Sequence, residues 1–166
     1  MTFEQYIQQE GFRQILEAAN IRLQKITDGQ FAFRLRSAED QGKKSQEALA
    51  LDIFDANTGK QRPIESVSGG EGFKASLSLA LGLSDSIASR AGGISVESLF
   101  IDEGFGSLDT SESLPETIDM LTTLSTKNKL VGIISHCEAL KSEISNQIVV
   151  TKSRGNSGST LEVVRK

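Results

Sequence analysis

The chain has 166 residues, 37% of them apolar, and a net charge of −4, which suffices for one globular domain with a core. One cysteine and one histidine exclude a disulfide framework and a zinc site. No apolar run approaches the roughly 20 residues of a membrane span, and the polar N-terminal stretch is unlike a signal peptide. We therefore expect a soluble cytoplasmic protein.

A helix is predicted first, over residues 3–27, because apolar residues recur there at helical spacing. Asp28-Gly29 ends it, and Gly29 suits the left-handed position after a helix. The near-heptad spacing is compatible with two interpretations. Residues 1–28 are either the root of a coiled coil that continues upstream, or an ordinary amphipathic helix packed on the domain.

Two strands are predicted next, over residues 31–36 and 48–54, with a polar loop over 37–46 between them. Residues 57–60 have the composition of a turn, and an extended segment follows over 62–64. In the second strand, Leu49, Leu51 and Ile53 are expected to share one face.

The stretch Ser68-Gly69-Gly70-Glu71 precedes a helix predicted over residues 71–90, with a buried stripe that includes Phe73, Ala80 and Ile87. Adjacent glycines allow a ligand to approach the backbone, and the helix N-terminus attracts a phosphate. Ser68 and Glu71 also have the spacing of a capping box, which needs no ligand. The stretch alone leaves both interpretations open.

The second half alternates short apolar runs with helices. We predict a strand over 98–101 buried on both faces, a helix over 111–126, an apolar strand over 130–134, a helix over 138–143, and strands over 147–152 and 160–165. Helical connections imply parallel pairing of the apolar strands, and the final two strands form a hairpin. The fold class is α/β with a mixed sheet and flanking helices.

Polar side chains follow the two apolar strands. Asp102 and Glu103 end the first, and His136 follows the second. Parallel strands bring their carboxyl ends to one edge, where α/β sheets bind ligands, so one acid could hold Mg²⁺ and the other face a water. A solvated acid pair and a structural histidine are the alternatives. Asp109 has the spacing of a helix cap with Glu112.

The order of these stretches resembles the ATP-binding-cassette ATPases, and within them the SbcC family of SMC-like ATPases. The matching segments are Val67-Ser68-Gly69-Gly70-Glu71 for the signature motif, Leu99-Phe100-Ile101-Asp102-Glu103 for Walker B, Ser107-Leu108-Asp109 for the D-loop and His136 for the switch histidine. The resemblance covers residues 29–166. It departs in small ways, with Val67 where leucine is common and Glu71 where transporters have glutamine.

The resemblance implies ATP and Mg²⁺ as cofactors. Ser68, Gly69, Gly70 and Glu71 would form the turn that contacts the γ-phosphate of ATP on a second copy of the head. Asp102 would bind magnesium, Glu103 would polarise the attacking water, His136 would sense the γ-phosphate, and Asp109 would cross the dimer interface. Glu103 and His136 are thus the expected catalytic residues.

A P-loop of the pattern G-x-x-x-x-G-K-[ST] is absent from the sequence. The resemblance therefore implies the C-terminal lobe of a head, residues 29–166, whose partners are its own N-terminal P-loop lobe, a second head, an SbcD-like metal-dependent nuclease and DNA, with no membrane. Such a protein would be a bacterial, nucleoid-associated ATPase, and this fragment alone would be inactive. Two alternatives stay open: a chromosome-organising SMC or RecF-like head, and a non-enzymatic interaction module.

Overall fold

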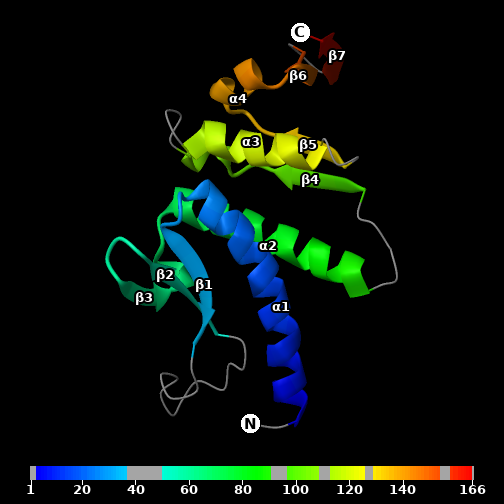
Figure 1. The fold of residues 1–166 in the computed structure, drawn as a ribbon. Helices are drawn as coiled ribbons and strands as arrows, with labels where there is room; N and C mark the ends of the chain where they lie inside the picture. Colours follow the sequence, from blue (N-terminus) through cyan, green and yellow to red (C-terminus); the bar gives the residue numbers. More distant parts are fainter. Residues whose placement is uncertain are drawn as a thin grey trace.

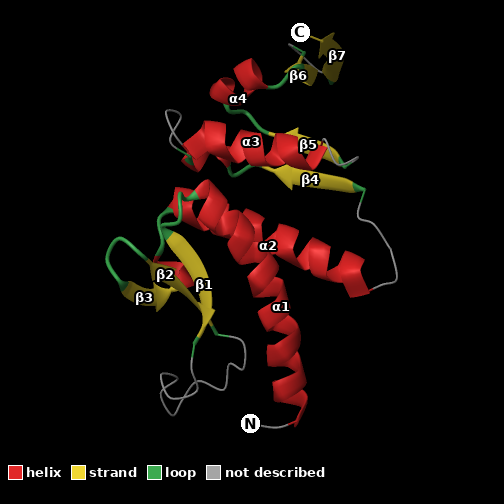
Figure 2. Cartoon of the chain, in the orientation of Figure 1, coloured by secondary structure: helices red, strands yellow, loops and turns green. Residues whose placement is uncertain are grey.

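The computed structural model describes residues 3–36, 50–90, 97–108, 113–125, 129–153 and 158–165. The elements, shown in Figures 1 and 2, are α1 (Phe3–Ile26), β1 (Phe31–Leu35), β2 (Leu51–Asp55), β3 (Lys60–Pro63), the 3₁₀ turn η1 (Ile64–Ser66), α2 (Gly69–Arg90), β4 (Ser98–Asp102), η2 (Phe105–Ser107), α3 (Ser113–Ser125), β5 (Leu130–Ile134), α4 (Glu138–Glu143), β6 (Asn146–Lys152) and β7 (Ser159–Arg165). The predicted α/β class is confirmed. Asp109, Leu49, the loop over 37–46 and most of the last hairpin tip lie outside the described residues.

The strands form three sheets. Strands β1, β2 and β3 pair antiparallel in that order, β4 pairs with β5 in parallel, and β6 pairs with β7 antiparallel. The predicted parallel and antiparallel pairings are therefore both present, and the extended segment before the glycine pair is the third strand of the first sheet. Burial in β2 is not confined to one face, because Asp52 is buried as well as its neighbour Ile53, and neighbouring strand residues point to opposite faces.

Helix α1 ends as its sequence predicts. Asp28 and Gly29 both have positive φ, and the Gly29 amide donates to the carbonyl of Gln24 at 2.7 Å. The fully buried residues described in α1, among them Leu16, Ala19 and Leu23, lie in its second half, while its first turns project from the body of the molecule in Figure 1.

Helices α1 and α2 cross in direct backbone contact at Gly82. A Cβ atom on Gly82 would lie 2.7 Å from both the amide nitrogen of Ala19 and the carbonyl oxygen of Ile15. Arg22 of α1 also forms an ion pair with Asp85 of α2. The second half of α1 and helix α2 are therefore packed as one unit.

Helix α2 begins at Gly69, two residues earlier than predicted, so the glycine pair lies in its first turn. It is buried on two sides, because Ala75, Ser78 and Gly82 lie on the α1 side and Leu77 and Leu81 pack in the core with α3. The single predicted stripe was wrong at two positions: Ala80 is exposed and Ile87 is 45% exposed. The tertiary crossing at Gly82 sets which faces are covered.

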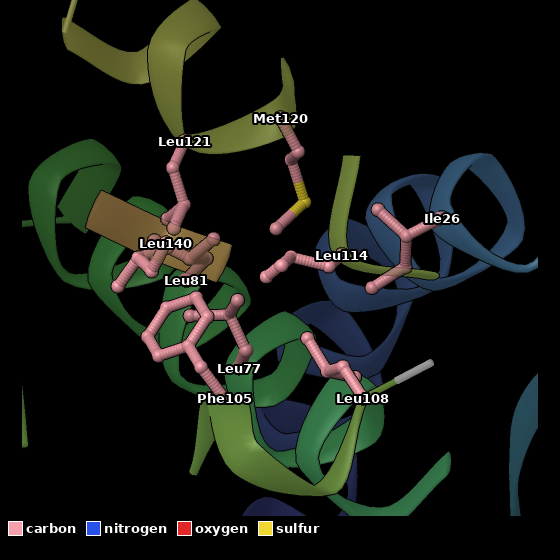
Figure 3. Packing of buried hydrophobic residues seen from close by; sticks show 9 residues of the cluster. All are labelled: Ile26, Leu77, Leu81, Phe105, Leu108, Leu114, Met120, Leu121 and Leu140. Carbon is pink, nitrogen blue, oxygen red and sulfur yellow. The ribbon is translucent and has the colours of Figure 1, made fainter. Parts of the chain in front are cut away.

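The buried apolar residues form two clusters on either side of α2. One lies between α1, α2 and the first sheet and includes Leu23, Phe33 and Ile53. The other, shown in Figure 3, joins α2 to α3, α4 and the loop after β4, and consists of Ile26, Leu77, Leu81, Phe105, Leu108, Leu114, Met120, Leu121 and Leu140. Pro115 lies in the first turn of α3, where proline is tolerated.

The prediction that β4 is buried on both faces was wrong. Its side chains alternate between partly buried and exposed, and Phe100 is 68% exposed. Leu130 and Ile134 of β5 are also exposed, as are Ile148, Val150, Leu161 and Val163 of the last hairpin. These residues form two exposed apolar faces, because Phe100, Leu130 and Ile134 alternate with covered positions and Ile148 and Val150 pair with Val163 and Leu161.

Candidate functional site

The carboxyl ends of β4 and β5 bring an acid and the histidine into contact. Asp102 is paired with Ile134, and the amide of the next residue, Glu103, donates to the Ile134 carbonyl at 2.8 Å. The Glu103 carboxylate then lies 3.0 Å from Nδ1 of His136. The predicted meeting of these side chains at one edge of the sheet is therefore what the geometry shows.

Both members of this pair are open to solvent. The Glu103 side chain is 49% exposed and the His136 side chain 85%. Asp102 is exposed too. Two acids on a strand buried on both faces would carry a desolvation cost, and the exposure of Asp102 and Glu103 avoids it. The acids and the imidazole can contact a ligand that arrives on this edge.

The backbone at the acid is unusual. Glu103 has φ of +60° and Gly104 has φ of +98°, so two consecutive residues are left-handed. This conformation is uncommon for a residue with a side chain and costs on the order of 1 kcal/mol. It turns the chain sharply out of β4 and aims the Glu103 side chain at His136.

The Ser68–Glu71 turn is a closed capping box. The Ser68 amide donates to Oε2 of Glu71 at 2.8 Å, and the Glu71 amide donates to Oγ of Ser68 at 3.4 Å. The capping interpretation left open by the sequence is therefore present. It leaves the amides of Gly69 and Gly70 at the N-terminus of a 22-residue helix, where an anion is favoured.

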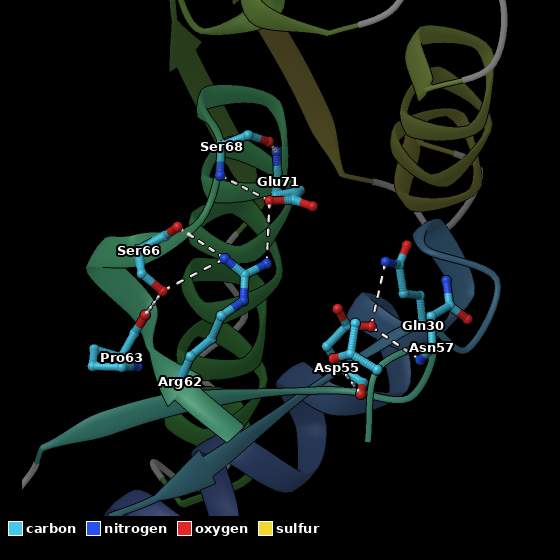
Figure 4. Close-up of polar contacts among 9 residues, drawn as sticks. Gln30, Asp55, Asn57, Arg62, Pro63, Ser66, Ser68 and Glu71 are labelled. Carbon is cyan, nitrogen blue, oxygen red and sulfur yellow. Dashed lines mark hydrogen bonds and ion pairs between the residues drawn. The ribbon is translucent and has the colours of Figure 1, made fainter. Parts of the chain in front are cut away.

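Arg62 of β3 fixes the segment that enters this turn, and the sequence motifs gave no indication of it. Its Nη1 donates to the Ser66 carbonyl at 2.8 Å, and its Nη2 lies 3.6 Å from Oε2 of Glu71 (Figure 4). The Ser66 hydroxyl donates in turn to the Pro63 carbonyl at 2.6 Å. One guanidinium thus connects the first sheet to both sides of the turn.

The glycine pair also has a packing role. A Cβ atom on Gly70 would lie 2.8 Å from the Ser107 carbonyl oxygen, and one on Gly69 would lie 3.5 Å from Cβ of Ser107. Gly70 therefore permits close approach of the loop after β4, in addition to any ligand. Any residue larger than glycine at position 70 would push the turn away from Ser107.

An open groove of about 600 Å³ adjoins the turn, lined by Ser68, Gly70, Lys74, Ser107 and Glu116 among others. Lys74 is largely buried and lies 3.3 Å from Glu116 of α3. The residues lining the groove do not include Asp102, Glu103 or His136. The predicted site residues therefore form two groups within one chain, the turn with its groove and the acid–histidine pair.

Among the described residues, no three histidine, cysteine or acidic side chains are grouped closely enough to hold a metal ion. Mg²⁺ commonly takes one or two protein carboxylates and completes its shell with waters and substrate phosphates. An exposed carboxylate at a strand end, such as Asp102, fits that donor set.

Two buried carboxylates of the first sheet, Asp52 and Asp55, have lowered pKa values. Hydrogen bonds from Arg36 at 2.9 Å and Gln61 at 2.9 Å outweigh burial and hold the pKa of Asp52 below its usual value. Burial raises the pKa of Asp55, but hydrogen bonds from Asn57, Gln30 and Thr58 more than offset it, so that pKa is lowered too. Figure 4 shows the contacts of Asp55 with Gln30 and Asn57. Both acids stabilise the first sheet.

Comparison with known sequences identifies relatives of nearly the whole chain. Residues 43–123 match the family described as SbcC/RAD50-like, Walker B motif. The chain is 47% identical over 144 residues to the SbcC component of the nuclease SbcCD from Treponema pallidum, and 41% identical over 154 residues to that of Staphylococcus haemolyticus. These alignments cover 87% and 93% of this chain, which spans only 14% and 15% of the relatives.

Solved structures with the same fold are SMC ATPase heads. One, from a study of ATP-driven dimerization and DNA-stimulated activation of SMC ATPases, aligns with a TM-score of 0.70 at 16% identity over 96% of this chain and 89% of its own. The Smc head of Pyrococcus furiosus bound to the C-terminal domain of ScpA aligns with a TM-score of 0.63 at 17% identity, over 93% and 35%.

None of the helices in the described ranges combines the length and apolar character that a membrane crossing needs.

The acid–histidine pair, the capped glycine turn, the relatives and the fold agree with one another. By sequence the chain is an SbcC/RAD50-like segment that includes the Walker B region, and its fold is that of the SMC heads.

Proposed function

We propose that this segment is the C-terminal half of a head that binds and hydrolyses ATP between two copies, and that it thereby gates a nuclease acting on DNA ends. The observation that supports this most strongly is the 3.0 Å contact between Glu103 and His136 at the carboxyl ends of two parallel strands. Ligands of open α/β sheets bind at such ends.

In this proposal the Glu103 carboxylate accepts a hydrogen bond from the attacking water and polarises it. His136, held beside it, contacts the γ-phosphate. Asp102 holds Mg²⁺, which neutralises phosphate charge when bound. The exposure of all three side chains supports this assignment, because an approaching triphosphate can reach them without any rearrangement of the core.

The Ser68–Glu71 turn serves the ATP of the second head. The separation of this turn from the acid–histidine pair supports this assignment, because the groove at the turn is lined by Ser68, Gly70 and Ser107, and not by the acids. Two groups that serve different nucleotides need not meet within one chain. Asp109, which follows this loop, would lie at the interface between heads.

The P-loop comes from an N-terminal lobe, since the sequence here has none. The exposed apolar faces support such a lobe, because seven large apolar side chains of β4–β7 are each more than half exposed: Phe100, Leu130, Ile134, Ile148, Val150, Leu161 and Val163. Faces of this kind mark protein–protein contacts. Without that lobe the segment does not hydrolyse ATP.

The names of the relatives support a nuclease partner, because each is a component of the nuclease SbcCD. We propose an SbcD-like metal-dependent nuclease as the partner, DNA as the substrate of the complex, and the nucleoid in the cytoplasm as its location. Residues 1–28 form the root of a coiled coil. The exposure of Tyr6 and Ile7 on the projecting end of α1, 52% and 53%, supports that role.

A chromosome-organising head without a nuclease is the alternative, because Smc heads share the fold. Sequence identity favours the nuclease-linked head, with 41–47% to the SbcCD relatives against 16–18% to the SMC heads. Copurification of the full-length protein with a metal-dependent nuclease supports the first function, and its absence supports the alternative.

The decisive test is Glu103→Gln in the full-length protein. We expect steady-state ATP hydrolysis to fall by about 100-fold or more, with ATP-dependent dimerization retained, because the amide cannot polarise the water. Glu162→Gln, the same change on exposed β7, is the matched control and should hydrolyse ATP normally. Unchanged hydrolysis in Glu103→Gln would remove the acid from its role.

A further inference from the structure

One aromatic side chain connects the two groups of site residues within the chain. Phe73 stands in the first turns of α2, directly behind the Ser68–Glu71 turn. Its ring packs edge-on against Phe105, with centroids 4.9 Å apart and planes at 60°. Phe105 is 1% exposed and belongs to the core shared by α2 and α3. The Phe73 ring is therefore held on a fixed support.

The same ring covers the α-carbon of Gly104. A Cβ atom at position 104 would overlap two of the ring carbons of Phe73. Glycine is thus required at position 104 for two reasons: its φ is +98°, and the Phe73 ring fills the space that a Cβ atom would need. The ring of Phe73 therefore contacts the residue that directly follows the proposed catalytic acid, Glu103.

Glu103 needs support of this kind. Its left-handed φ of +60° is strained for a residue with a side chain, and such conformations persist only where the surroundings determine them. On one side, its amide is fixed by the 2.8 Å hydrogen bond to the Ile134 carbonyl. On the other, the following residue lies against the Phe73 ring. The Glu103 side chain itself is half-exposed and has little packing to hold it.

We propose that Phe73 is a positioning residue: its ring, packed on Gly104, locks the left-handed turn that holds the Glu103 carboxylate beside His136. The inference deepens the proposed function and rests on it. It gives α2 a second role, because the helix that presents the Ser68–Glu71 turn at its start also sets the acid at the end of β4. The two groups are mechanically joined although they line different surfaces.

The first test is Phe73→Leu in the full-length protein. Removing the ring frees Gly104, and misplaced catalytic groups lose rate steeply, so we expect kcat for ATP to fall about tenfold with KM changed less than about twofold. Phe73→Tyr keeps the ring and should restore kcat. Phe33→Leu is the matched control, since Phe33 is 3% exposed in the other core cluster, and it should lower stability without lowering kcat.

The deciding measurement is a double-mutant cycle with Glu103→Gln. If Phe73 acts through the acid, Phe73→Leu should change the residual hydrolysis of Glu103→Gln by less than about twofold. An equal tenfold loss in both backgrounds, or an unchanged kcat in Phe73→Leu alone, overturns the positioning role and leaves the proposed function intact. Normal hydrolysis in Glu103→Gln alone overturns the proposed function itself.

A variant that does not fold is detected by thermal unfolding. In that case Phe73→Met, which conserves most of the volume without a rigid ring, replaces Phe73→Leu in the same cycle. The same two outcomes then apply to it.

Discussion

The region built from α1, α2 and the first sheet differs from the region that contains β4 to β7. In the first, α2 is covered on both sides and the sheet packs its apolar residues inward, so Leu23 and Ile53 are fully buried. In the second, both small sheets leave an apolar face open, and Phe100 and Ile148 are 68% and 69% exposed. The first region covers its own apolar surface, whereas the second leaves open apolar faces of the kind that mark protein–protein contacts.

The largest expected difference between the regions is in the cost of losing an apolar side chain. Leu23→Ala should lower the free energy of unfolding of the 166-residue chain by about 3 kcal/mol, because Leu23 is fully buried. Val150→Ala, at a residue 64% exposed, should change it by less than about 0.5 kcal/mol. Urea unfolding measures both. Equal losses would mean that the open faces are covered within this chain.

The helix crossing is the next point of difference. Gly82→Ala should destabilise the chain by about 2 kcal/mol, since its Cβ would overlap the backbone of α1 and the gain in helix propensity is smaller. Gly106→Ala is the control, because apart from its two chain neighbours none of the described residues has an atom within 4 Å of a Cβ there. If both variants unfold at the same urea concentration, the close crossing does not exist in solution.

The first region should also respond to acid. The pKa of Asp52 is lowered from 3.8 in the folded state. The ionised carboxylate therefore adds to the free energy of unfolding above pH 3.8, and this stabilisation is lost as the pH falls below that value. Asp52→Asn should cost about 1.5 kcal/mol at pH 6, and the difference from the unaltered chain should shrink as pH falls through 3.8 toward 3. A difference that is constant with pH would contradict the ionic role.

The smallest expected effect is a gain in stability. Ser78 of α2 is fully buried, and its hydroxyl has no hydrogen-bond partner within the part of the chain that the structure describes. Ser78→Ala should raise the free energy of unfolding by about 0.5 kcal/mol, through helix propensity and loss of an unpaired polar atom. A loss of stability would show that the hydroxyl has a partner.

The candidate site was predictable where chemistry and sequence spacing coincide. Asp102, Glu103 and His136 follow apolar strands, and parallel pairing alone brings strand ends together. Arg62 and Phe73 were not predictable, because an arginine in an exposed strand and an apolar residue in a helix have no distinctive pattern. Their roles come from contacts with residues nine and thirty-one positions away, Glu71 and Gly104.

By itself, the sequence determined the helices and strands, the parallel pairing and the capping box, because these depend on local periodicity and on spacings of a few residues. Tertiary structure alone decided which faces are covered, as at Ala80 and Phe100, and that Gly70 and Gly82 are contact points between segments. Burial depends on what packs opposite a residue, and spacing along the chain does not specify that.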